Sequence, residues 1–412
     1  MTLTRAHCEQ LDAEDPLRGF RERFDLPEGV TYLDGNSLGA LPKATAGRLE
    51  AVARREWGGD LIKSWNVHSW IEAPLRVGAK IAPLIGAKAH EVAAADSTSV
   101  NLFKLAAGAL GLRPDRRTIL SEPGNFPTDL YMLQGLEALL GGRVRLKTAP
   151  ADVIAGEIDD DTACVVLTHV HYKSGRRHGM AAITAAAQAK GALMLWDLSH
   201  SAGAIQVDLN GCGADLAVGC GYKYLNGGPG APAFVFVAER HQAAIPTPLT
   251  GWMGHAAPFA FVDEYQPAPD IRRQLCGTPS ILALAALEVG LDIFAETSMA
   301  AVEAKSARLC DLFIELVERR CAGFGLELVS PRAADGRGSQ VSFAHPEGYA
   351  LMQALIARGV IGDFRAPDIA RFGFTPLYTR FVDAWDAAEA IGEVLESRAY
   401  EREEYRVRAA VT

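Results

Sequence analysis

A carboxylate and a lysine stand at two points of the chain that a folded sheet would bring together. Residues 192–198 (ALMLWDL) form an apolar run that carries Asp197, and residues 216–220 form a second run that leads to Lys223. Apolar runs of this length are typical of buried parallel strands, whose carboxyl ends deliver functional groups. The glycines around Lys223, in GYKYLNGGPG, permit a sharp turn close to a ligand.

An acid and a lysine in this arrangement suit the cofactor pyridoxal 5'-phosphate (PLP). Its ring withdraws electrons only while the pyridine nitrogen is protonated, so an acid must lie against that nitrogen while a lysine holds the aldehyde carbon. Lysine suits the second role because its pKa falls readily on desolvation. In isolation, Asp197 and Lys223 fit a strand-end cap and a solvated loop lysine better, and it is their neighbours that favour a PLP site.

Those neighbours resemble the kynureninase family of fold-type-I PLP enzymes. The resemblance lies in DLSH (residues 197–200) and GYKYLNGGPG (221–230), and it continues in five further blocks in one collinear order. These blocks are LDGNSLG (33–39), DSTSVNLFK (96–104), PGNFPTDLY (123–131), GWMGH (251–255) and RFGFTPLY (371–378). The family's reaction is the PLP-dependent hydrolysis of L-kynurenine to anthranilate and L-alanine by Cβ–Cγ cleavage, in tryptophan degradation by the kynurenine pathway, which also feeds NAD synthesis.

The fold implied is α/β, with a large, mainly parallel-sheet domain and a smaller α+β domain. A chain of 412 residues is too long for one core. Strands alternate with helices up to residue 200, which predicts right-handed crossovers and a mainly parallel sheet. We expect an N-terminal arm at 1–45 that joins the small domain, a large PLP-binding domain at 46–285 and a small domain at 286–412.

Several residues gain a cofactor-binding role from the resemblance. Thr98 and Ser99 open a predicted helix, where free N–H groups and the helix dipole favour a phosphate, although an ordinary helix cap explains one hydroxyl residue equally well. Phe126 is expected over the face of the PLP ring and Asp129 near its polar edge. Taken alone, Phe126 would be a core residue and Asp129 a cap.

Three more residues are expected at the cofactor. Thr168 is among the polar last residues of the predicted strand at residues 163–172, and His200 follows Asp197 in DLSH. Tyr222 stands beside Lys223, and we expect it to bind at the cofactor and to polarise the substrate carbonyl as an acid–base group. With Lys223, it completes the expected catalytic pair.

The substrate residues come from both ends of the chain. Arg371 is the candidate for the α-carboxylate, because a guanidinium binds a carboxylate through two parallel N–H donors. A surface ion pair is the alternative for any single arginine, and the role of Arg365 stays open. Asn36 and Ser37 lie in a glycine-flanked loop that, by resemblance, closes over the substrate; a simple turn is the alternative.

The resemblance also implies a homodimer with shared active sites. Trp252 and Thr278 would reach the partner's cofactor, and both side chains can donate a hydrogen bond to a phosphate. Animal-type kynureninases carry Asn-Pro-Pro where this chain has Thr278-Pro-Ser280. That asparagine is associated with ring-hydroxylated substrates, so we expect a preference for kynurenine over 3-hydroxykynurenine.

Composition excludes other classes of partner. The net charge of -9 gives no basic face for nucleic acid, and no run of about 18 apolar residues could span a membrane. The polar start is no signal peptide, so we expect a cytoplasmic protein. The seven cysteines lack CxxC spacing and are expected to be reduced. His169, His171 and His178 lack acidic or cysteine co-ligands, so no metal site is predicted.

Two other functions fit the same scaffold. One is a different PLP reaction, such as that of a cysteine desulfurase or a class V aminotransferase, and the other is a non-catalytic binding or regulatory protein. A desulfurase needs an exposed nucleophilic cysteine, yet Cys310 and Cys321 lie in and at the end of a helical pattern. A regulator would usually carry an added DNA-binding domain, and no basic segment suggests one.

Overall fold

The computed structural model describes residues 3–408 and builds the larger part of the chain on a seven-stranded sheet. The strands follow the order β4-β10-β9-β8-β7-β5-β6. Their bounds are β4 Val92–Ala94, β5 Thr118–Ser121, β6 Arg145–Thr148, β7 Thr162–Thr168, β8 Leu193–Asp197, β9 Leu216–Gly219 and β10 Phe234–Val237. All pairs are parallel except those of β10, which runs antiparallel to β9 and β4. The predicted α/β class and mainly parallel sheet are confirmed.

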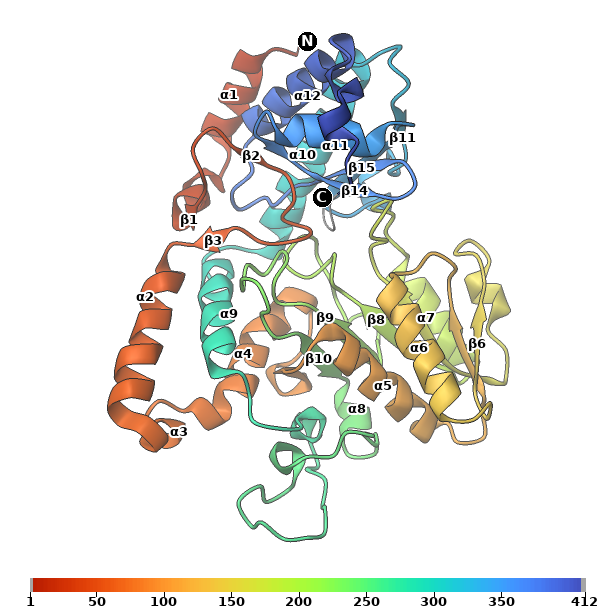
Figure 1. Ribbon diagram of the computed structural model, residues 1–412. Coiled ribbons are helices and arrows are strands. Elements are labelled where there is room, and N and C mark those ends of the chain that lie inside the picture. The colour runs from red at the N-terminus through yellow and green to blue at the C-terminus, as the bar shows by residue number, and fades with distance from the viewer. Residues whose placement is uncertain (1–2, 409–412) are drawn as a thin grey trace.

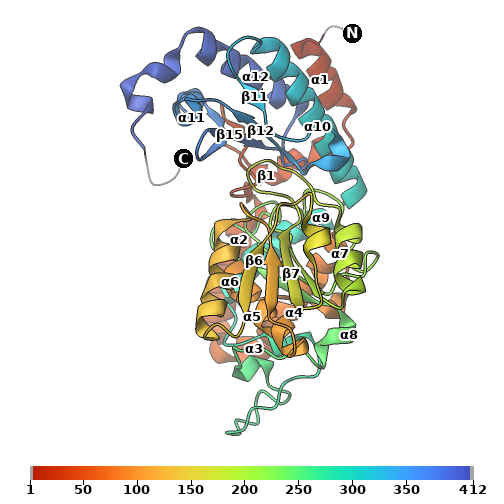
Figure 2. The same cartoon turned by 90° about the vertical axis from the view of Figure 1, so that its right-hand side faces the viewer.

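Helices cover both faces of this sheet (Figures 1 and 2). Residues of β7 alternate between the two faces: Val165 and Leu167 pack in one cluster with α4, α7 and α9, and Cys164 and Val166 pack in another with α5 and α6. The helices of this part are α2 Ala44–Ala51, α3 Ser64–Val67, α4 Ala73–Ile81, α5 Thr98–Leu112, α6 Pro127–Leu139, α7 Met180–Ala189, α8 Glu239–Gln242 and α9 Ile281–Phe294. A helix over residues 42–57 fits the sequence pattern, but α2 ends at Ala51 and the chain continues as a wider π-helical segment, Val52–Asp60.

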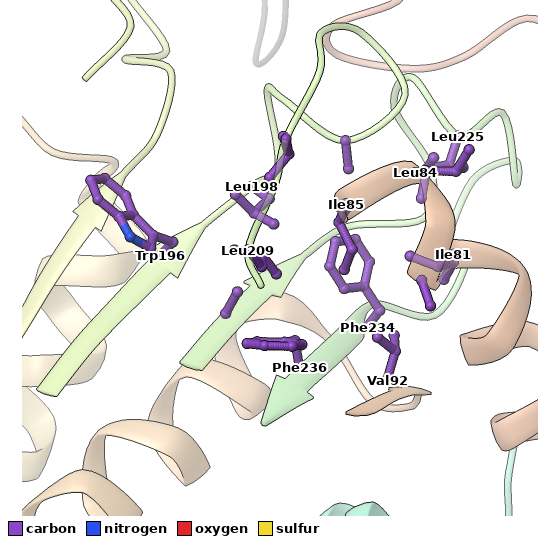
Figure 3. Close-up of a cluster of buried hydrophobic side chains, with 14 of the residues drawn as sticks. Ile81, Leu84, Ile85, Val92, Trp196, Leu198, Leu209, Leu225, Phe234 and Phe236 are labelled. Atoms are coloured by element: carbon purple, nitrogen blue, oxygen red, sulfur yellow. The ribbon is translucent and has the colours of Figure 1, made fainter. Parts of the chain in front are cut away.

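A core of aromatic and branched side chains fixes the sheet against α4 (Figure 3). Phe234 on β10 lies toward Ile85, and Phe236 on the same strand belongs to the same cluster as Ile81, while Trp196 lies on β8, one residue before Asp197. These side chains are almost fully buried. Because protein interiors are close-packed, this core sets the position of the strand ends that carry the predicted site.

The C-terminal part forms a second layer with its own core. Its antiparallel sheet has the order β11-β12-β15-β14, with β11 Glu327–Leu328, β12 Gln340–Ala344, β14 Asp363–Arg365 and β15 Ile369–Gly373. Its helices are α10 Met299–Arg320, α11 Gly348–Ile356 and α12 Phe381–Glu396. None of the helices in residues 3–408 is both long and apolar enough to cross a membrane.

The N-terminal segment lies against this second layer, as Figure 1 shows for α1 Arg5–Glu14 beside α12. Strand β2 Thr31–Tyr32 pairs in parallel with β13 Val360–Ile361, and β1 Phe24–Asp25 pairs with β3 Leu41–Pro42. The Asp12 carboxylate accepts hydrogen bonds from the Phe381 and Val382 N–H groups at the start of α12. The boundaries at residues 45 and 285 stay predictions.

A buried ion pair fastens the N-terminal segment to α10. The Asp15 carboxylate lies 2.6 Å from the Lys305 amine, and both side chains are buried. We predict that Asp15→Ala lowers the free energy of unfolding by about 3 to 5 kcal/mol, because it leaves a buried charge without its partner. The exposed pair of Asp386 with Arg5 is the control, and Asp386→Ala should cost at most about 1 kcal/mol. Equal losses in urea unfolding would contradict the assignment.

Candidate functional site

Lys223 lies in a buried turn just after β9. Its Nζ is 3.0 Å from His200 Nε2, and it lies 5.7 Å from the centroid of the Phe126 ring. The Tyr222 ring centroid is 5.8 Å away. Burial and then the charge of Lys223 hold the pKa of His200 well below its usual value, so this histidine is neutral. Its other ring nitrogen, Nδ1, is buried without a partner among the described residues.

A pair of carboxyl groups lies at the strand ends next to this turn. Thr168 and Asp197 end β7 and β8 and are directly paired in register, while Asp129 lies in the first turn of α6. The Asp129 and Asp197 carboxyls share a hydrogen bond. Burial and then the charge of Asp197 raise the pKa of Asp129 well above its usual value. The pair therefore keeps one proton, carried by Asp129.

Asp197 is held in place by its neighbours. Its Oδ1 accepts a hydrogen bond of 2.8 Å from the Ser199 N–H and one of 2.6 Å from the Ser199 hydroxyl. Burial raises its pKa, while the Ser199 bonds and the charge of Lys223 oppose that shift. The Thr168 hydroxyl is 3.5 Å from Asp129 Oδ2 and also contacts the Asn125 side chain. Ser199 and Asn125 were not singled out from the sequence, although both stand inside the quoted blocks.

A pocket of about 620 Å³ opens beside Tyr222. Thr98 at the start of α5 lines it, and so does Thr278. Ser99 is in the first turn of α5 but is not a lining residue. A helix N-terminus here presents backbone N–H groups and a positive dipole end to an anion.

A buried lysine stands behind this helix start. The Lys104 amine lies 2.7 Å from Asp96 and donates a 2.6 Å hydrogen bond to the Gln274 carbonyl. Asp96 lines the pocket but Lys104 does not, and Lys223 is the lysine that contacts His200.

The predicted substrate arginine is fully buried and already engaged. Arg371 Nε donates a 2.7 Å hydrogen bond to Asp363 Oδ1, and Nη2 contacts Asp363 Oδ2. Nη1 donates to the Tyr172 carbonyl at 2.6 Å, and Nη2 also reaches the Ser37 hydroxyl at 2.9 Å. Tyr172 packs edge-on against Phe126 with ring centroids 5.2 Å apart, which links the arginine to the Lys223 cluster.

Two predicted residues lie outside these groups. Asn36 is buried beside Gly373, and neither atom of its amide has a partner in the described part of the chain. Trp252 lines a different hollow with Gly251 and His255, where it packs on Phe259. The structure thus separates Trp252 from the Lys223 cluster of its own chain.

The three histidines considered for a metal site have separate partners. His169 Nδ1 lies 2.9 Å from the Ser201 hydroxyl, and His171 Nε2 lies 2.8 Å from the Gly124 carbonyl. His178 Nε2 is 2.8 Å from the buried carboxylate of Glu122, whose pKa is lowered, against the effect of its burial, by that contact. Each ring is used in structural hydrogen bonding at a different place.

These residues fit the PLP predicted from the sequence. Asp197 is a buried acid at the end of β8, and His200 Nδ1 is a buried polar atom that lacks a partner among the described residues. Phe126 supplies an aromatic face 5.7 Å from the Lys223 amine, and the start of α5 supplies a phosphate site at the pocket. A protonated ring nitrogen against Asp197 would compensate the charge that the carboxyl pair carries.

Comparison with known proteins identifies close relatives. Residues 302–391 match the family model described as the kynureninase C-terminal domain. The chain is 56% identical to the kynureninase of Burkholderia mallei (strain SAVP1) over 415 residues, which cover 99% of this chain and 100% of that protein. It is 53% identical to the kynureninase of Pseudomonas fluorescens over 415 residues, which again cover 99% of this chain and 100% of that protein.

Solved structures share the fold at much lower identity. The apo cysteine desulfurase of Thermococcus onnurineus NA1 superposes with a TM-score of 0.78 at 20% identity, covering 92% of this chain and 98% of that one. A C-DES variant with glycine covalently linked to its PLP cofactor gives a TM-score of 0.76 at 17% identity, covering 92% and 99%. These similarities establish the fold-type-I architecture.

Asp34 gives a test of the electrostatics around Arg371. Burial of its carboxyl group and the charge of Asp363 raise its pKa from 3.8 to about 8, against the effect of Arg371. Between these two pH values the folded protein keeps a proton that the unfolded chain has lost, so stability falls as the pH rises.

We predict that Asp34→Asn removes this pH-dependent loss of stability. The free energy of unfolding of the variant, relative to that of the wild type, should grow between about pH 4 and about pH 8, by at most about 1.4 kcal/mol per pH unit. Urea unfolding at a series of pH values measures it, with the exposed Asp263→Asn as control. Parallel stability curves for Asp34→Asn and the wild type would refute the raised pKa.

Proposed function

The chain belongs to the kynureninase family, and we propose that the side chains around Lys223 carry out the hydrolysis of L-kynurenine to anthranilate and L-alanine. The observation that carries this assignment to the site is the buried cluster of Lys223, His200 and Asp197 beside an aromatic face and a phosphate-type pocket. The cofactor is PLP, which, when bound, withdraws electrons from the carbon atoms next to the substrate amino group.

We propose the following cofactor contacts. Lys223 would hold the cofactor, and its amine is placed to move the proton at the substrate Cα. Asp197 would keep the pyridine nitrogen protonated, with Asp129 and Thr168 in support. Phe126 and His200 would flank the ring, and the α5 start with Thr98 and Ser99 would bind the phosphate.

Tyr222 is proposed to act on the substrate carbonyl. Burial raises the pKa of its phenol above the usual value, so the hydroxyl stays protonated and can donate to the developing oxyanion. It lines the pocket and neighbours Lys223, so one turn presents both groups that move protons.

The substrate's α-carboxylate is proposed to bind at Arg371, with the loop of Asn36 and Ser37 above it. Ser37 already contacts the Arg371 guanidinium, which ties this loop to the carboxylate site. We also propose that the water molecule that hydrolyses the carbon–carbon bond is enclosed together with the substrate, because a site open to solvent would allow side reactions.

Other PLP reactions are less well supported by the chain's own residues. None of its seven cysteines, all of which lie in described segments, is exposed: Cys212 and Cys276 are half-buried and the others are buried. Desulfuration would require an accessible thiolate. Family membership favours hydrolysis over this reaction, over transamination and over a non-catalytic role.

We also propose a cytoplasmic homodimer with shared active sites. Unpaired cysteines suit a reducing compartment. The segment that carries Trp252 also exposes the apolar side chains Phe259, Phe261 and Val262, and it projects from the large layer in Figure 2. Exposed apolar groups of this kind favour contact with another protein surface. In such a dimer Trp252 and Thr278 would donate to the partner's cofactor phosphate.

We predict that the purified protein with PLP releases fluorescent anthranilate from L-kynurenine. Lys223→Ala should lose both turnover and the visible absorbance of covalently held cofactor, because within residues 3–408 no other amine contacts His200 or acts on Asp197. The exposed Lys190→Ala is the control and should match the wild type. Full turnover in Lys223→Ala would show that another lysine does the chemistry.

We further predict a preference for kynurenine over 3-hydroxykynurenine. Thr278 lines the pocket, and a pocket without a partner for the additional hydroxyl leaves that group desolvated at about 1 to 3 kcal/mol, or about 5- to 150-fold in kcat/KM. Thr278→Asn should narrow this ratio. Equal or reversed kcat/KM values for the wild type would contradict the prediction.

A further inference from the structure

Asp363 joins two arginines at the predicted carboxylate site. Its Oδ2 accepts a 2.7 Å hydrogen bond from Arg365 Nη2 and also contacts Arg371 Nη2, while Oδ1 accepts from Arg371 Nε. The Ser37 hydroxyl donates to the same Oδ2 at 2.7 Å. A single buried carboxylate thus fixes both guanidinium groups side by side, on adjacent strands β14 and β15.

The two arginines differ in the N–H donors that remain available to a ligand. Four N–H···O contacts occupy Arg371, whose side chain is 1% exposed. A guanidinium has five N–H donors, so Arg371 retains a single one. Arg365 is 35% exposed, its Nε is buried without a partner, and no described residue bonds to its Nη1. Its Nη2 donates to Asp363 and, at 3.3 Å, to the Ser37 hydroxyl, so Nη1 is the group through which Arg365 can donate to a substrate carboxylate.

Arg365 also influences the reaction site electrostatically. Its charge lowers the pKa of Tyr222 and of Tyr172, against the effect of their burial, and with Arg371 it lowers the pKa of His200. These influences place Arg365 within electrostatic range of the group proposed to polarise the substrate carbonyl.

The cluster of Arg365, Arg371 and Asp363 carries a net positive charge that suits one anion. Arg365 and Arg371 bring two positive charges, and Asp363, whose pKa is lowered by the Arg371 charge and contact despite its burial, brings one negative charge. Asp34 stays protonated at neutral pH, since its pKa is about 8. The balance is a surplus of one positive charge, which a substrate carboxylate neutralises.

We propose that Asp363 is a positioning residue that holds Arg371 and Arg365 as one cationic unit, and that the substrate α-carboxylate binds to both arginines, with Arg365 supplying the outer donors. This rests on the proposed function and deepens it, because recognition of the amino acid then depends on two guanidinium groups. Asp363 acts through the arginines and does not touch the substrate.

The test compares Arg365→Met and Arg365→Lys with Arg332→Met, an exposed arginine of the same layer that pairs with Glu318. Arg365→Met should raise KM for kynurenine about tenfold or more with kcat within about threefold, as expected for binding that is equal in ground and transition states. Arg365→Lys should fall between them, because an ammonium keeps the charge but not the planar Nη1 donors. An unchanged KM in Arg365→Met would overturn the proposal.

The positioning role has its own readout. Asp363→Asn should also raise KM for kynurenine. In the Arg365→Met variant the same substitution should raise KM by less than about a further twofold, since the effects of coupled residues are not additive. Independent, multiplicative effects in the double variant would overturn the role of Asp363. If Asp363→Asn fails to fold, the half-buried Arg365 variants still decide the two-arginine site.

A binding measurement separates this inference from the reaction. The visible absorbance of the PLP-loaded protein is titrated with L-alanine and with ethylamine, which lacks the carboxylate. Wild-type protein should bind L-alanine more tightly, and Arg365→Met should lose about tenfold of that discrimination. If the wild type forms no anthranilate, the proposed function fails while this titration still tests the carboxylate site. Equal discrimination in both proteins would refute it.

Discussion

Two acidic side chains meet in the interior of the protein, and the surrounding groups are arranged to keep their combined charge small. Asp129 keeps a proton because Asp197 and burial oppose its ionisation, while Asp197 is stabilised by Ser199 and by the charge of Lys223. Two buried like charges at contact distance would be strongly unfavourable. A cationic ring nitrogen is therefore the ligand group that this position favours, and the charge of Lys223 already acts on the same carboxyl group.

The reacting groups come from both layers of the molecule, and residues 33–39 connect them. The Gly39 N–H donates to the Tyr222 carbonyl at 2.8 Å, beside Lys223, and the Gly373 N–H donates to the Leu33 carbonyl at 2.6 Å, beside Arg371. Ser37 completes the carboxylate site between these two anchors. The loop at residues 33–39 thus connects the turn that carries Tyr222 and Lys223 in the large layer with Arg365 and Arg371 in the small layer.

The strand-end groups could be predicted from the sequence because apolar runs and glycine-rich turns are local signals. Thr168, Asp197 and Lys223 were placed in this way, and α5 begins at Thr98 as expected. The partners of Arg371 could not be predicted, because Asp363 and Tyr172 reach it only through tertiary packing. Asp363 stands two residues before Arg365 and eight before Arg371, and an acid this close to two arginines in the sequence could have indicated an ion pair with them.

Trp252 marks the limit of reasoning from one chain. It was expected at a partner's cofactor, and in its own chain it lies in a separate hollow. Its role therefore stays a prediction about the assembled dimer. The roles of Thr98, Phe126, His200 and Arg371 remain proposals. Phe126 and His200 lie beside Lys223, whereas Thr98 lines the pocket and Arg371 lies in the small layer.

The central claim is that Lys223 is the residue that carries the cofactor. Reduction of the PLP-loaded protein with borohydride fixes the cofactor to the amine that holds it, and mass spectrometry of the digested protein identifies that residue. The account predicts the cofactor on the peptide that contains Lys223 and on no other lysine. Attachment at Lys104, the buried lysine behind the α5 start, or at any exposed lysine would contradict it.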